Sequence, residues 1–112
     1  MKWTTMMTAA SLALACSQSA TAAGDIAAGK EKSALCVACH ADDGNSPSAQ
    51  FPRIGGQYAS YLEHALNAYK NGERKNPIML GIVSQLSKED MANLAAFYAS
   101  QKSPLRTPDL DD

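Results

Sequence analysis

The sequence predicts a single all-α domain. Apolar residues recur at helical spacing over residues 58–69 and 91–98, and residues that cap helices stand at the starts of the candidate helices. No segment shows the alternation of apolar and polar residues that is typical of a half-buried strand. The chain has 112 residues, 46% of them hydrophobic, and a formal net charge of −1, which fits one domain and argues against nucleic-acid binding.

The first residues have the pattern of a secretory signal. Lys2 precedes an apolar run that ends near Cys16, and the small-residue sequence Ala20-Thr21-Ala22 follows. We expect residues 1–22 to be cleaved, which indicates a periplasmic protein. Lipoprotein anchoring through Cys16 is the alternative, although Ala13 stands where such sites usually have Leu. The apolar run is too short for stable membrane insertion.

Cys36, Cys39 and His40 form the motif Cys-x-x-Cys-His. This spacing binds a haem covalently, because both thiols add to the vinyl groups of the ring from one helical turn, and the histidine follows beneath the iron. Thiol redox enzymes and zinc sites also use Cys-x-x-Cys. The former need a βαβ pattern, and the latter need a second ligand pair, for which only Cys16 and His64 remain. The sequence therefore predicts one covalent haem c and its iron.

The first predicted helix begins at Asp25 or Ile26, with Asp25 as its N-cap, and runs to the haem motif. Gly29 lies inside it, where glycine costs about 1 kcal/mol relative to alanine. Close approach of another helix is the usual reason for such a glycine, and tolerance on an exposed face is the alternative. Residues 41–47 are rich in turn-forming residues, which predicts a loop after the motif.

The second predicted helix begins near Tyr58 and ends at Asn71-Gly72. One stripe of its apolar residues is assigned to the core, namely Tyr58, Leu62, Ala65, Leu66 and Tyr69. His64 lies off this stripe, so we expect its side chain to be exposed and free of metal.

The last predicted helix has the clearest start. Its markers are Leu86 and Met91 as a hydrophobic staple, Ser87 as N-cap, and Glu89 and Asp90 in the first turn. Its apolar face continues through Met91, Leu94, Ala95 and Tyr98. Residues 103–112 show no apolar period, which predicts a mobile tail and leaves residues 23–102 for the folded domain.

Two methionines of the mature chain, Met79 and Met91, are candidates for the second iron ligand. Met91 is needed for packing in the staple, whereas Met79 follows Asn76-Pro77 in a predicted loop that is free to turn toward the haem. Methionine paired with histidine favours the reduced iron of an electron carrier. We favour Met79. A His64 ligand is one alternative, and an open sixth position, as in a haem enzyme or gas sensor, is the other.

The order and spacing of these features resemble the bacterial monohaem class I cytochromes c, and one half of the dihaem two-domain cytochromes c. The matching segments are Gly29 and residues 36–40, 43–47, 51–57, 79–82 and 94–98. The resemblance implies the class I cytochrome c fold, in which small helices wrap a covalent haem and the N- and C-terminal helices cross. It places Gly29 at that crossing, against Phe97 or Tyr98.

The resemblance also implies roles for individual residues. It assigns His40 and Met79 to the iron, and it assigns the Pro52 carbonyl as acceptor for the Nδ1 proton of His40, which fixes the ring. Arg53 and Gln57 belong to a loop that the resemblance places near the haem ring, and they are candidates for contacts with a propionate.

Covalent haem and two strong axial ligands suit one-electron transfer without bond making, so we expect a carrier and no catalytic residue. A soluble monomer is expected to dock briefly with redox partners, such as a quinol-oxidising complex, a terminal oxidase, a reductase or a dehydrogenase. An electron-entry subunit of a larger oxidoreductase is the alternative. Lys70, Arg74 and Lys75 are candidates for a basic docking patch, with ordinary solvated charges as the alternative.

Overall fold

A computed structural model describes residues 23–104. The expected signal over residues 1–22, with Cys16, and residues 105–112 of the expected tail lie outside this range. The elements are, in order, α1 (Ile26–Lys32), the 3-10 turn η1 (Ser33–Leu35), α2 (Val37–His40), α3 (Ala59–Asn71), α4 (Pro77–Val83) and α5 (Lys88–Ala99). Residues 23–104 contain no strand, so the all-α prediction is confirmed. None of these helices has the length and apolar character to cross a membrane.

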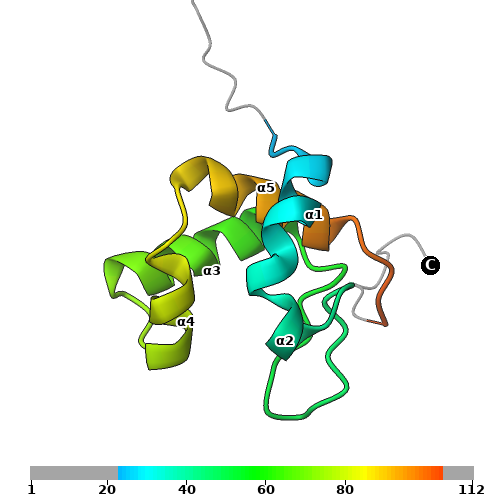
Figure 1. Ribbon diagram of the computed structural model, residues 1–112, viewed down its shortest axis with the longest axis horizontal. Coiled ribbons are helices and arrows are strands. Elements are labelled where there is room, and N and C mark those ends of the chain that lie inside the picture. Colours follow the sequence, from blue (N-terminus) through cyan, green and yellow to red (C-terminus); the bar gives the residue numbers. More distant parts are fainter. Residues whose placement is uncertain (1–22, 105–112) are drawn as a thin grey trace, which may run out of the picture.

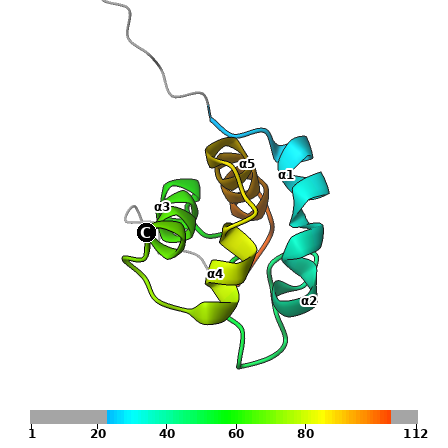
Figure 2. The same ribbon diagram turned by 60° about the vertical axis from the view of Figure 1, so that its left-hand side comes forward.

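Helices α1 and α5 pack against each other (Figure 1 and Figure 2). Asp25 caps α1 as predicted, because its carboxylate accepts a hydrogen bond from the N–H of Ala28 at 2.9 Å. A Cβ atom at Gly29 would lie 2.0 Å from the carbonyl oxygen of Asn93 and 2.8 Å from Cβ of Phe97. The crossing at Gly29 is therefore possible only because this residue has no side chain.

Helix α5 lies at the centre of the fold, with α1 on one side and α3 on another (Figure 2). Its predicted start is confirmed. Ser87 Oγ accepts from the N–H of Asp90 at 3.0 Å, and the Asp90 carboxylate accepts from the N–H of Ser87 at 2.9 Å. The staple residues Leu86 and Met91 are buried. The core side chains from α5 are Met91, Leu94, Ala95, Phe97 and Tyr98.

Helix α3 ends as predicted at Gly72, which has φ 84°. The predicted core stripe is right for Leu62, which is buried, and wrong for Tyr58, which is 60% exposed. Tyr58 precedes the first turn and has ψ 132°, so its side chain does not follow the register of the helix. Ala65, Leu66 and Tyr69 are half-buried, and His64 is exposed as expected.

Residues 77–83 form a helix where the sequence predicted a loop, so the local structure expected around Met79 is wrong. The Asn76 side chain accepts hydrogen bonds from the N–H groups of Ile78 at 3.0 Å and Met79 at 3.1 Å. Pro77 occupies the first helical position, which suits its fixed φ and its missing N–H. Helix α4 packs against α3, which stabilises so short a helix.

The long segment from Ala41 to Tyr58 is irregular, as predicted, and hydrogen bonds hold it to the helices. The N–H of Ile54 donates to the Gly44 carbonyl at 2.8 Å, and the N–H of Gly56 donates to the Tyr98 carbonyl at 2.9 Å. Asn45 binds the chain beyond α5, because its Nδ2 donates to the Lys102 carbonyl at 2.8 Å. The domain boundary at residue 102 stays a prediction.

Candidate functional site

A cavity of about 310 Å³ has walls from α2, the irregular segment, α3, α4 and α5. Its volume lies within the range of roughly 300–1,000 Å³ that small-molecule and cofactor sites occupy. All residues that the sequence singled out for the site line this one cavity, namely Cys36, Cys39, His40, Pro52, Arg53, Gln57 and Met79. The remaining lining residues are mostly aliphatic or aromatic, so a largely apolar group with a few polar atoms fits the cavity.

Helix α2 is the single turn that presents the cysteines and the histidine of the motif. Cys36 caps it, and the carbonyl of Cys36 accepts from the N–H of His40 at 2.9 Å. Both cysteines are half-buried, and neither forms a disulfide within residues 23–104. Burial raises the pKa of the Cys36 thiol above its ordinary value. Two thiols on one wall of the cavity are available to a group inside it.

The imidazole of His40 is buried and held in one orientation. Its Nδ1 lies 2.9 Å from the carbonyl oxygen of Pro52, and the ring of Phe51 meets it edge-on with centroids 6.4 Å apart. A carbonyl can only accept, so Nδ1 carries the proton and Nε2 keeps its lone pair. The histidine is therefore in the tautomer that a metal ligand bound through Nε2 requires.

Ala41, directly after His40, has φ 66° and ψ 169°. It is the one non-glycine residue with positive φ in the described part of the chain. This region of φ and ψ is almost restricted to glycine, and a residue with a side chain is strained there. The strain marks the sharp exit of the chain from α2 into the segment that brings Pro52 back to His40. No sequence pattern around Ala41 predicts this conformation.

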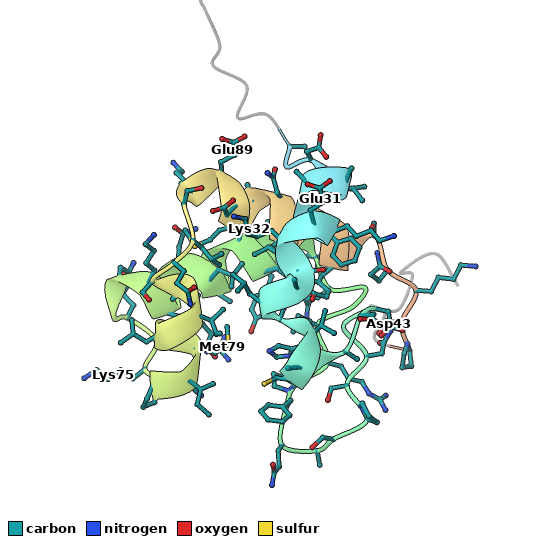
Figure 3. All side chains as sticks on the ribbon, viewed as in Figure 1. Glu31, Lys32, Asp43, Lys75, Met79 and Glu89 are labelled. Atoms are coloured by element: carbon teal, nitrogen blue, oxygen red, sulfur yellow. The ribbon has the colours of Figure 1, made fainter. Side chains whose placement is uncertain are left out.

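Met79 and Met91 take different places. Met79 is half-buried, and Figure 3 shows it pointing from α4 toward the space between α4 and α2. Met91 is 2% exposed and belongs to the core of α5, outside the cavity lining. His64 is exposed and does not line the cavity either. Of the candidate second ligands, Met79 is the one that the fold brings to the wall opposite His40.

Two guanidinium groups line the cavity, whereas none of its lining residues within 23–104 is Asp or Glu. Within residues 23–104 the hydrogen-bond contact of Arg53 is a long one, 3.5 Å from its Nε to the Ser46 carbonyl. Gln57 is held by its own turn, since its Oε1 accepts from the N–H of Tyr58 at 2.9 Å. Arg53 and Arg74 are both exposed, and within residues 23–104 neither has a carboxylate partner. Two such cations beside a mostly apolar cavity suit a bound group that carries negative charge.

Arg74 is a site residue that the sequence reasoning assigned elsewhere. Its guanidinium carbon lies 4.9 Å from the centroid of the Tyr69 ring, and both side chains line the cavity. The three residues of the predicted basic patch, Lys70, Arg74 and Lys75, therefore do not form one docking surface. Lys70 donates to the Leu86 carbonyl, and Lys75 is exposed and points away from the cavity in Figure 3.

Tyr98 is the second site residue that was missed, because its helical spacing indicated packing alone. It lines the cavity together with Cys36, is 3% exposed, and its hydroxyl is buried with no hydrogen-bond partner among residues 23–104. Burial, and then the neighbouring Cys36, raise the pKa of Tyr98 far above its ordinary value, so the phenol stays protonated. A buried donor without an acceptor calls for an explanation in any native structure.

An all-α fold that places Cys-x-x-Cys-His and a methionine around one apolar cavity defines a c-type cytochrome. Residues 26–102 match the family model described as cytochrome c, and the chain belongs to this family. The chain is 48% identical over 83 residues to cytochrome c4 from Pseudomonas aeruginosa, a match that covers 74% of this chain and 41% of that protein. Its cofactor is therefore covalently bound haem c with its iron.

Two further comparisons agree with this assignment. The chain is 45% identical over 83 residues to cytochrome c-554(548) from Halomonas halodenitrificans, covering 71% of this chain and 100% of that protein. The crystal structure of reduced recombinant cytochrome c4 from Pseudomonas stutzeri superposes with a TM-score of 0.68 at 42% identity, over 71% of this chain and 47% of that one. This chain thus spans less than half the length of these two cytochromes c4 and corresponds to one of their domains.

Proposed function

We propose that this protein is a periplasmic one-electron carrier in which His40 and Met79 bind the iron of haem c from opposite sides. The observation that carries the proposal is the cavity itself. Both cysteines, His40 and Met79 line it, while Met91 and His64 lie outside. Bound haem supplies the Fe(III)/Fe(II) couple, which gains and loses one electron without breaking bonds.

Hydrogen bonds within the chain fix the orientation of the His40 ring and the backbone that carries Met79. The Pro52 carbonyl accepts a hydrogen bond from Nδ1 of His40, with 2.9 Å between nitrogen and oxygen, and this contact fixes the imidazole plane. Asn76 caps α4 through two hydrogen bonds and fixes the backbone from which the Met79 thioether projects. A soft thioether stabilises the reduced iron, so we expect a higher potential than a bis-histidine site has.

Three polar side chains are suited to the carboxylates of the haem. Arg53 and Gln57 were expected there, and Arg74 joins them because it lines the same cavity. A guanidinium beside a carboxylate makes a charge-assisted hydrogen bond and compensates the charge that the apolar walls cannot solvate. Arg74 is exposed, and its packing on the Tyr69 ring holds the guanidinium beside the cavity.

The lining favours a carrier over a haem enzyme or gas sensor. With Met79 at the sixth position no open site remains for a substrate or gas. The cavity lining within residues 23–104 also includes neither a carboxylate nor a second histidine that would serve as acid or base. We therefore propose a soluble, monomeric carrier that exchanges electrons with a quinol-oxidising complex, a terminal oxidase, a reductase or a dehydrogenase. An electron-entry subunit of a larger oxidoreductase uses the same site and is the second candidate.

The test is a spectroscopic redox titration of protein exported together with the haem-attachment machinery, with and without carbon monoxide. We expect one reversible one-electron transition and a reduced spectrum that carbon monoxide leaves unchanged, because both axial positions are occupied by side chains. A high-spin spectrum that changes on adding carbon monoxide would show an open position and would favour the enzyme or sensor.

A further inference from the structure

We propose that the Tyr98 hydroxyl donates a hydrogen bond to the sulfur of Cys36 after that sulfur has become a thioether. Through this contact Tyr98 acts as a positioning residue that holds one edge of the cofactor and raises its reduction potential. The inference rests on the proposed function, since the thioether exists only when haem is attached.

The starting observation is an anomaly in the core. Tyr98 is 3% exposed, and its hydroxyl is a buried donor for which residues 23–104 supply no conventional partner. Leaving such a group unpaired costs free energy, and native proteins seldom retain one without a use. A phenylalanine would fill the same volume without this cost, so the hydroxyl needs an explanation that the packing of α5 does not give.

The ring of Tyr98 has little freedom to turn its hydroxyl elsewhere. Its centroid lies 4.9 Å from that of Phe97. On the side of the irregular segment, a Cβ atom at Gly44 would lie 2.8 Å from its Cδ1. The Tyr98 carbonyl accepts from the N–H of Gly56 at 2.9 Å, which anchors the backbone as well. These contacts restrict the orientation of the Tyr98 ring, so its hydroxyl stays in the buried interior.

Cys36 is the acceptor that this position favours. It packs against the core cluster that contains Tyr98, and the two residues line the same cavity. Ser33 is the competing neighbour, because it is buried and also influences the pKa of Tyr98. The Ser33 hydroxyl donates to the Lys30 carbonyl at 2.6 Å and keeps its lone pairs, so it can still accept from Tyr98, and the experiment has to distinguish the two acceptors.

The electrostatic consequence has a definite sign. A thioether sulfur is a weak acceptor, and a phenol that donates to it directs the positive end of its O–H dipole at the edge of the haem. A positive dipole end stabilises the added electron, so the contact favours the reduced state. Loss of the hydroxyl is then expected to lower both the reduction potential and the thermal stability.

The experiment is a double-mutant cycle on the haem-loaded protein. Tyr98→Phe is made in the wild-type background and in Cys36→Ala, where the haem is attached through Cys39 alone, and Tm and reduction potential are measured for each. Tyr58→Phe is the matched control, because it removes the same hydroxyl from a side chain that is 60% exposed and outside the cavity lining. We expect Tyr98→Phe to lower both quantities in the wild-type background, and to have less than half of each effect without Cys36.

Two results of this cycle would overturn the proposal. A higher Tm with an unchanged potential would mean that the hydroxyl has no partner, and equal losses in both backgrounds would assign it to Ser33. If Cys36→Ala is not loaded with haem, Ser33→Ala is used as the second background. An effect of Tyr98→Phe that disappears in Ser33→Ala contradicts the proposal.

The long-wavelength ferric band of sulfur ligation is recorded for each variant. Its absence in the wild type would reject the His40/Met79 site and not the Tyr98 contact.

Discussion

Replacing Ala41 by glycine is predicted to stabilise the protein. Ala41 has φ 66° and ψ 169°, a conformation that costs a residue with a Cβ atom roughly 1–3 kcal/mol. Glycine relieves this strain but raises the entropy of the unfolded chain, which costs roughly 0.5–1 kcal/mol. The middle of these ranges gives a net gain of about 1 kcal/mol. For a domain of this size that corresponds to a rise in Tm of roughly 4–8 °C.

The assay is thermal unfolding of the ferric, haem-loaded protein, followed by circular dichroism. Ala27→Gly is the matched control, since Ala27 is an exposed residue of α1 with ordinary helical backbone, where the same change costs about 1 kcal/mol. The two alanine-to-glycine variants are thus expected to shift Tm in opposite directions. An Ala41→Gly variant that unfolds at or below the wild-type temperature would refute the argument from strain.

Three further predictions concern the helix crossing, the cavity charge and the cap of α5. Gly29→Ala is expected to lower stability by at least about 1–3 kcal/mol in denaturant unfolding, because the added methyl group would lie 2.0 Å from a backbone oxygen of α5; unchanged stability would contradict the crossing. Arg74→Gln is expected to lower the reduction potential more than Lys75→Gln does, although both remove one positive charge, and equal shifts would remove Arg74 from the cavity. The hydrogen bond from the Ser87 N–H holds the pKa of Asp90 below its ordinary value of 3.8. The ionised Asp90 carboxylate therefore contributes to stability above pH 3.8, and this contribution is lost as the pH falls through the lowered pKa. Asp90→Asn should therefore unfold with a weaker dependence on pH below about 4 than the wild type, and an equal dependence would contradict the assignment.

The parts of the fold that local chemistry determines were predictable from the sequence. Asp25 and Ser87 cap their helices because side-chain acceptors satisfy the first free N–H groups, and this depends on residues no more than three positions away. Gly29 was recognisable because a glycine inside a helix needs a reason. The segment around Met79 was misread because Asn-Pro begins turns and helices alike, and the packing of α4 on α3 decides between them.

The site residues also fall into two groups, those that the sequence indicates and those that only the tertiary structure brings to the cavity. The haem motif and its histidine are visible as a spacing. The position after Asn76-Pro77 favoured Met79, and the resemblance to class I cytochromes c agreed with Met79 and supplied Pro52. Arg74, Tyr98 and the strained Ala41 were not visible, because their roles depend on tertiary placement. Arg74, which is exposed, follows the end of α3 and packs on Tyr69 at the cavity, and Tyr98 reaches the cavity from a helix whose spacing indicates only a core.

The most direct test of the central claim is the visible spectrum of the ferric protein, for the wild type, Met79→Ala and Met91→Leu. Met91→Leu is the control because it removes the other candidate sulfur while nearly conserving the volume of a buried side chain. We predict that the weak long-wavelength band of sulfur bound to ferric haem is present in the wild type and in Met91→Leu, and absent from Met79→Ala. A band that survives in Met79→Ala, or that the wild type lacks, would contradict ligation of the iron by His40 and Met79.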